Sequence, residues 1–206
     1  MDNTISAIFK EKNEKILFDK LLLDIDNNFD SLLLTINNKI ALSTPKLIKK
    51  VNDVLFNYQV DYDLKSLTEL LNQEVEKINK MVVGLLDLKK AKLKEAIQKA
   101  SSFTTSEFDT DIDESTKKFR EEFDVSMNKV IYLDLSGAIS KNYNLEEEAI
   151  NDLNTYLNNY DMSVSDAIID SIEYRDNTLK NITKETYNKY IELNNKTANL
   201  NIKKSN

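Results

Sequence analysis

The stretch LKSLTELLNQEVEKINKMVVGLLDLKKAKLKEAIQKA, residues 64–100, decides the fold class. Its apolar residues recur at steps of three and four, which is the spacing of a single apolar stripe on an α-helix. The stripe contains Leu64, Leu67, Leu71, Val75, Ile78, Val82, Leu85, Leu93, Ala96 and Ala100, and one of its positions falls on Lys89. The single glycine of the stretch, Gly84, costs about 1 kcal/mol relative to alanine. We therefore expect one long helix here, which needs equally long partners to bury its stripe.

The first 60 residues predict a long helix followed by a short one. A stripe over residues 3–42 is formed by Phe9, Ile16, Leu22, Ile25, Phe29, Leu32, Ile36 and Ile40, and Leu23 widens it. Ser43, Thr44 and Pro45 then carry the signals of a helix end and a new start, because threonine caps helices and proline suits the first helical position. A short helix over 45–58 follows, and Asp63 is placed to cap the helix over 64–100.

The second half of the chain repeats this order. The polar cluster over 101–106 separates it from the first half. A helix is expected over 107–141 with a stripe from Ile112 to Leu133, backed by Met127, Ile131, Leu135 and Ile139. A break at 142–144, a short helix over 145–160, a break at 161–163 and a helix over 164–195 complete the chain. Both halves thus read long, short, long.

This order predicts an all-α fold, namely an elongated antiparallel bundle of four long helices with two short helices at one end. Residues 1–206 would form a single domain whose halves, 1–103 and 104–206, are candidate products of a duplication. In the alternative arrangement each short helix continues its long neighbour, and a second chain completes the apolar seam.

The composition excludes most sheet folds and most catalytic chemistry. Two glycines and one proline are too few for the turns of a sheet protein. Because histidine and cysteine are both absent, the common nucleophile and base pairs and thiolate metal sites cannot form. No glycine-rich phosphate loop is present either. The sequence therefore predicts no catalytic, metal-binding or cofactor-binding residue and no cofactor, and we expect a protein that is not an enzyme.

Charge and aromatic residues are unevenly distributed, which suggests a contact surface. The chain carries a net charge of −7, yet residues 1–103 sum to +1 and residues 104–206 to −8. Seven of the nine tyrosines lie at or after Tyr132, and tyrosine is favoured at interfaces where one end stays wet. The candidate interaction surface comprises Lys89, Lys90, Lys92, Lys94, Lys99, Tyr174, Tyr187 and Tyr190. In the alternative interpretation, the lysines form an ordinary solvated face, and the tyrosines reflect a second half of the bundle that is less tightly packed.

These observations favour a helical scaffold or interaction protein whose partner is another protein or a second copy of itself. A regulatory bundle that binds a small molecule between helices is the second hypothesis, and a nucleic-acid or membrane-surface binder using residues 89–99 is the third. The net negative charge argues against general nucleic-acid binding. The absence of cysteine suits the cytoplasm, although a secreted or surface-exposed protein can also lack it.

Overall fold

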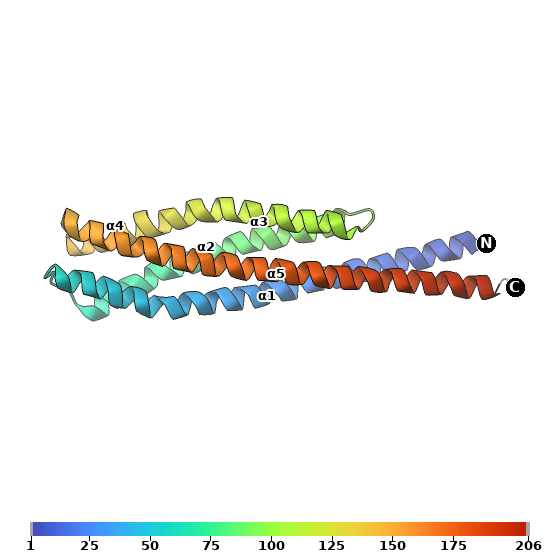
Figure 1. The fold of residues 1–206 in the computed structure, drawn as a ribbon, viewed down its shortest axis with the longest axis horizontal. Coiled ribbons are helices and arrows are strands. Elements are labelled where there is room, and N and C mark those ends of the chain that lie inside the picture. Colours follow the sequence, from blue (N-terminus) through green and yellow to red (C-terminus); the bar gives the residue numbers. More distant parts are fainter. Residues whose placement is uncertain (1, 205–206) are drawn as a thin grey trace. The chain divides into compact units, whose positions relative to one another are not determined.

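The structure is a computed structural model that describes residues 2–204. These residues form helices and short connections without any strand, so the all-α prediction is confirmed (Figure 1). The elements are α1 (Asp2–Asn57), α2 (Leu64–Lys99), α3 (Thr105–Asn128), the π-helix η1 (Lys129–Leu135), α4 (Ser136–Tyr143) and α5 (Glu147–Lys204). No helix among the described residues has a segment that is both long and apolar enough to cross a membrane.

Contacts divide the described chain into two compact units. Unit 1 contains the residues up to Ser31, Leu88–Thr116, and the residues from Glu173 on. Unit 2 contains Leu32–Asp87 and Lys117–Ile172. Helices α1, α2, α3 and α5 each contribute residues to both units. Each unit therefore draws on both predicted halves of the sequence, and neither coincides with 1–103 or 104–206.

The two predicted short helices over 45–58 and 145–160 do not exist as separate elements. Helix α1 continues through Pro45 to Asn57, and α5 continues through 161–163. Proline inside a helix costs about 3 kcal/mol, but the side chains that follow it are fully buried in unit 2. These are Leu47, Val51 and Leu55. Each such burial contributes about 1.5–3 kcal/mol, so packing outweighs the local break signal.

Local hydrogen bonds show how the polar residues fit inside these long helices. The hydroxyls of Ser43 and Thr44 both donate to the carbonyl of Ile40, at 2.7 and 2.9 Å. In α5, the Ser165 hydroxyl donates to the Asp161 carboxylate at 2.9 Å. Thr44, which the sequence predicts as a cap, and the polar residues around 161–163 thus bond within their own helix. The alternative arrangement, in which each short helix continues its neighbour, describes both helices correctly.

The stripe of α2 lies where the sequence predicts it. Its buried members include Leu67, Leu71, Val75, Ile78, Val82, Leu93 and also the polar Lys89. Some members differ from the expectation, because Leu64 is exposed, Leu86 is buried where Leu85 was expected, and Ile97 is buried where Ala96 was expected. Asp63 caps the helix as predicted, since its carboxylate accepts a 2.8 Å hydrogen bond from the Ser66 N–H.

In the later part of the 107–141 segment, the π-helix η1 places in the core the residues that were expected to back the predicted stripe. The buried residues there advance in steps of four, through Phe123, Met127, Ile131, Leu135 and Ile139. An α-helix of 3.6 residues per turn would rotate such a series away from the core, whereas the wider turn of a π-helix keeps it in place. Leu133, expected in the stripe, is consequently exposed.

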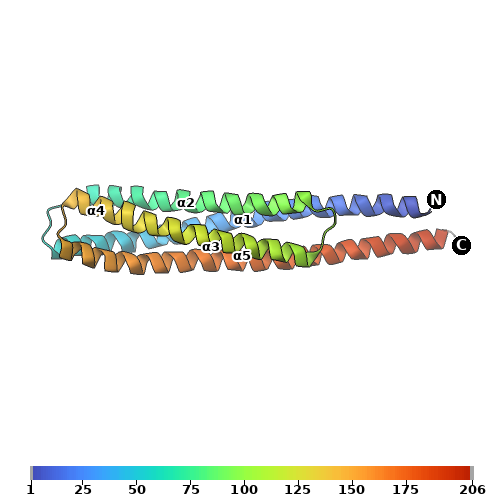
Figure 2. The same ribbon diagram turned by 90° about the horizontal axis from the view of Figure 1, so that it is seen from above.

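Helices α1 and α5 are antiparallel neighbours within each unit (Figures 1 and 2). In unit 1, the Asn13 side chain donates a 2.8 Å hydrogen bond to Asn194. In unit 2, the Lys39 ammonium donates to the Ala167 carbonyl at 3.1 Å. Within unit 1 both helices also extend beyond the loop that joins α2 to α3 (Figure 2).

Candidate functional site

The first predicted surface residue, Lys89, is a core residue of unit 1. Its side chain is only 2% exposed, and its ammonium lies 3.0 Å from the Asp176 carboxylate on α5. It also donates to the hydroxyls of Ser115 and Thr116 on α3, at 2.7 and 2.8 Å. Thr116 in turn donates to Asp176. The prediction that Lys89 contributes to an interaction surface is therefore wrong, because three helices close around it.

Burial and pairing act in opposite directions on this ion pair. Burial lowers the pKa of Lys89 and raises that of Asp176, since each charged form has lost water. The attraction between the two charges and their hydrogen bonds oppose both shifts. The pair thus links α2, α3 and α5 inside unit 1, and its position in the core gives it a structural role.

The neighbouring lysines of α2 face carboxylates of α1 within unit 1. Lys94 lies 2.9 Å from Asp26, and Lys90 lies 3.1 Å from Asp26 and 3.7 Å from Asp30. The Lys94 hydrogen bond, aided by Lys90, lowers the pKa of Asp26 below its ordinary value. These pairs neutralise much of the predicted basic face.

The two remaining lysines lie on the exposed side of α2. Lys99 pairs with Glu95 one turn earlier on the same helix, and that hydrogen bond lowers the pKa of Glu95. Lys92 is exposed. The structure therefore places the five predicted lysines in three different environments, namely core, inter-helix ion pair and solvent.

The three predicted tyrosines do not form one surface. Tyr190 is buried, and its hydroxyl donates a 2.9 Å hydrogen bond to Glu14. Tyr187 is half-buried, with its ring 6.0 Å from those of both Phe103 and Tyr190. Tyr174 is exposed and lies beneath the Arg175 guanidinium at 5.7 Å. Only Tyr174 of the three keeps a solvent-facing ring.

Two features of the structure were missed from the sequence. The first is a row of exposed apolar side chains on α1 in unit 1, formed by Phe9, Ile16 and Leu23. The sequence predicts Phe9 and Ile16 as core residues, because their spacing fits a stripe. Spacing alone does not show where along the helix that stripe has no neighbouring helix to pack against. Their spacing of seven residues is itself a signal, because it repeats the seam of a coiled coil.

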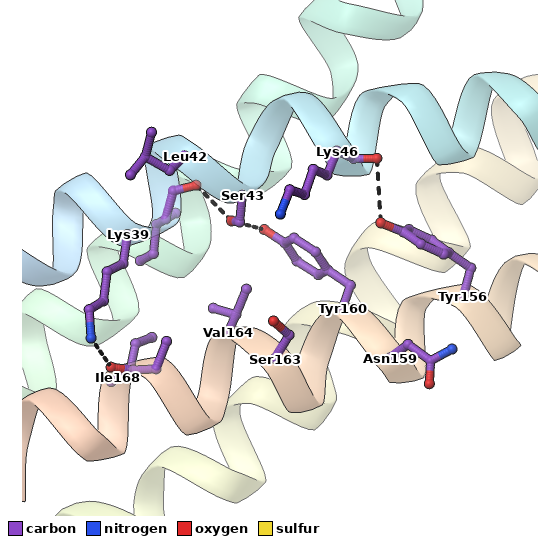
Figure 3. A pocket seen from close by; sticks show the side chains of 12 residues that line it. Lys39, Leu42, Ser43, Lys46, Tyr156, Asn159, Tyr160, Ser163, Val164 and Ile168 are labelled. Atoms are coloured by element: carbon purple, nitrogen blue, oxygen red, sulfur yellow. Dashed lines mark hydrogen bonds between the residues drawn. The ribbon is translucent and has the colours of Figure 1, made fainter.

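The second missed feature is a groove between α1 and α5 in unit 2 (Figure 3). It has a volume of about 360 Å³. The space is open because three of its lining residues have small side chains, namely Ser43 on α1 and Ser163 and Ala167 on α5. Ser43 and Ser163 belong to the two segments whose composition suggests helix breaks. Their small side chains instead hollow the contact between two continuous helices.

Polar groups converge on this groove from both helices. Ser43 Oγ and Tyr160 Oη are 3.4 Å apart, and the Tyr156 hydroxyl donates to the Lys46 carbonyl at 3.4 Å (Figure 3). Burial raises the pKa of Tyr160, so its hydroxyl stays protonated at neutral pH. Lys39 and Lys46 line the groove from α1, and no carboxylate lines it.

No protein-family model, curated protein or solved structure matches the chain. Among the described side chains, no group of three or more aspartates and glutamates is arranged to hold a metal ion. The geometry of the two units therefore carries the functional argument.

Proposed function

We propose that the protein is a non-enzymatic helical interaction protein that associates with a second copy of itself through the outer face of α1 in unit 1. The observation that carries this proposal is the row Phe9, Ile16 and Leu23, whose residues are 44%, 56% and 58% exposed. A seven-residue apolar repeat is the spacing of one of the two seam positions of a coiled coil. Two copies bury six such side chains between them, and because each is already partly covered, each contributes less than the roughly 1.5–3 kcal/mol of full burial. This burial supplies the attraction that works against the cost of association.

Charge on the same face supports a second copy as the partner. Lys12 and Asp19 are exposed, lie seven residues apart beside the row, and have no ion-pair partner among the described residues. In an antiparallel pairing centred near Ile16, Lys12 of each copy meets Asp19 of the other. A two-fold contact thus contains this pair twice, and Phe9 packs near Leu23.

The lysines of α2 are less suited to this role. Lys89 is buried, and Lys90 and Lys94 already contact carboxylates of α1. A nucleic acid or an anionic membrane would have to compete with those carboxylates. Because the lysines of α2 are already buried or paired, we favour the α1 row over them as the contact surface.

Sedimentation velocity over a range of concentrations tests the proposal. We expect the natural protein to pass from monomer to dimer with rising concentration, and Ile16→Lys to remain monomeric. Leu34→Lys is the matched control, because Leu34 is 64% exposed on the same helix but lies in unit 2. A natural protein that stays monomeric, or an Ile16→Lys variant that dimerises normally, contradicts the proposal.

A charge-reversal series identifies the partner more specifically. Lys12→Asp places two carboxylates together at each end of the contact, so we expect weaker dimerisation. Adding Asp19→Lys restores opposite charges in a contact between identical copies, and dimerisation should recover. Failure of the double variant to recover would mean that Lys12 and Asp19 do not face each other.

A further inference from the structure

We infer that the groove between α1 and α5 in unit 2 is a binding site for a small amphiphilic carboxylate, that is, an anionic head on a short apolar chain. This inference concerns a different surface from the contact proposed for α1 in unit 1, and it stands independently of it. It rests on the shape of the groove, the residues of its floor and the charges at its edge.

The floor of the groove suits an apolar chain. It contains the buried side chains of Ile40, Val164 and Ile168, together with the ring of Tyr160. The volume of about 360 Å³ falls within the range of small-molecule sites, roughly 300–1,000 Å³. Because Ser43, Ser163 and Ala167 are small, the space between the two helices is open to a short chain.

The edge of the groove suits an anion. Lys39 and Lys46 are seven residues apart, and both lie on the face of α1 that borders the groove. The Lys39 ammonium contacts a backbone carbonyl, that of Ala167, and neither lysine has a carboxylate partner among the described residues. A ligand carboxylate would supply the partner that the protein does not.

Hydroxyl groups add a means of fixing the head group. Tyr160 Oη and Ser43 Oγ lie on facing helices, 3.4 Å apart, at the side of the groove where Lys46 enters (Figure 3). The Tyr160 hydroxyl can donate to a carboxylate oxygen placed near the Lys46 ammonium, while the single hydroxyl proton of Ser43 is donated to the Ile40 carbonyl at 2.7 Å. Hydrogen bonds to a charged group contribute more than neutral ones, so this end of the groove defines the orientation of the ligand.

Titration of the full-length protein with octanoate, followed by ¹H–¹⁵N correlation spectra, tests the site. We expect saturable shifts confined to the amides of residues 39–46 and 156–168. 1-Octanol lacks the charge, and one charge-assisted contact is worth roughly a factor of ten. Acetate keeps the charge but lacks the apolar chain whose burial favours binding. We therefore expect both to bind at least about tenfold more weakly than octanoate. Shifts spread over both units without saturation, or equal binding of octanol and octanoate, would overturn the inference.

Variants at the edge and the floor complete the test. Lys39→Gln with Lys46→Gln should weaken octanoate binding about tenfold or more, while Lys49→Gln with Lys50→Gln, exposed on the same helix outside the groove, should leave it unchanged. Ala167→Leu should abolish binding by filling the groove, with circular dichroism checking that the variant folds. Unchanged affinity in the Lys39/Lys46 variant overturns the inference, as does binding of anionic phospholipid vesicles without any binding of octanoate.

Discussion

At the scale of single residues, the buried pair of Lys89 and Asp176 is the most sensitive point of unit 1. Lys89→Met would leave the Asp176 carboxylate in the core without its ammonium, and breaking a buried pair in this way costs about 3–5 kcal/mol. Urea denaturation followed by circular dichroism measures the loss in free energy of unfolding. The loss should shrink at lower pH, because the raised pKa of Asp176 lets protonation remove the unpaired charge.

Two controls separate this effect from a general loss of charge. Lys20→Met removes a lysine of the same unit whose ion pair with Asp24 is surface-exposed, and it should cost less than about 1 kcal/mol. Combining Lys89→Met with Asp176→Leu replaces the pair by apolar side chains, which is often neutral or stabilising, so most of the stability should return. If the double variant is as unstable as Lys89→Met alone, the unpaired carboxylate is not the cause.

The ion pairs of Asp26 lead us to expect that unit 1 loses stability in acid. Its contacts with Lys94 and Lys90 lower its pKa, so its contribution to stability is present above its ordinary pKa of 3.8 and disappears as pH falls through the lower folded value. Asp26→Asn should cost about 1 kcal/mol or less at pH 7, because the group is partly exposed. Urea midpoints between pH 3 and 7 should converge for the two proteins at the acid end. A constant difference across that range contradicts the assignment.

The candidate residues show how far sequence reasoning reaches at this scale. The sequence places Lys89 at a position of the apolar stripe, and its side chain is buried because that position faces the core. Its partner could not be found, because Asp176 lies 87 residues away and the helix pairing was unknown. Tyr187 and Tyr190 were read as interface residues for the same reason, since the ring contact of Tyr187 with Phe103 and the hydrogen bond of Tyr190 to Glu14 depend on tertiary packing.

At the scale of elements, helix boundaries were predictable where local and tertiary signals agree. Helix α2 spans Leu64–Lys99 against the expected 64–100, because Asp63 caps its start and most of its stripe is buried. The boundaries of α1 and α5 were wrong because Pro45 and the 161–163 segment are strong local break signals. The burial that outweighs them is set by neighbouring helices, which a single sequence does not reveal.

Gly84 offers a direct test of helix propensity within α2. A Cβ at this position meets no heavy atom within 4 Å, and its backbone is helical. Gly84→Ala should therefore raise the free energy of unfolding by about 1 kcal/mol, through helix propensity alone. The reverse change at the exposed Ala91 of the same helix should lower it by a similar amount. Equal stability of Gly84→Ala and the natural protein would indicate that α2 bends or opens at this glycine.

At the scale of the whole molecule, the net charge of −7 opposes the proposed self-association. Two acidic copies repel each other, and salt screens that repulsion, with a Debye length of about 10 Å at 0.1 M and 3 Å at 1 M. The apolar row on α1 is little affected by screening, whereas the Lys12–Asp19 pairs lose strength. Because the repulsion involves all charges and the attraction only two pairs, we expect the dissociation constant of the dimer to fall as salt increases.

Sedimentation equilibrium between 0.05 and 0.5 M sodium chloride measures this dependence. The Ile16→Lys variant provides the control, because it should stay monomeric at every salt concentration if association uses the α1 row and not general salting-out. A second approach lowers the pH toward the isoelectric point of about 4.9, where the net repulsion vanishes and the dimer should strengthen without added salt. A dissociation constant that rises with salt would instead indicate a contact dominated by opposite charges, and the lysines of α2 would then become the surface to mutate.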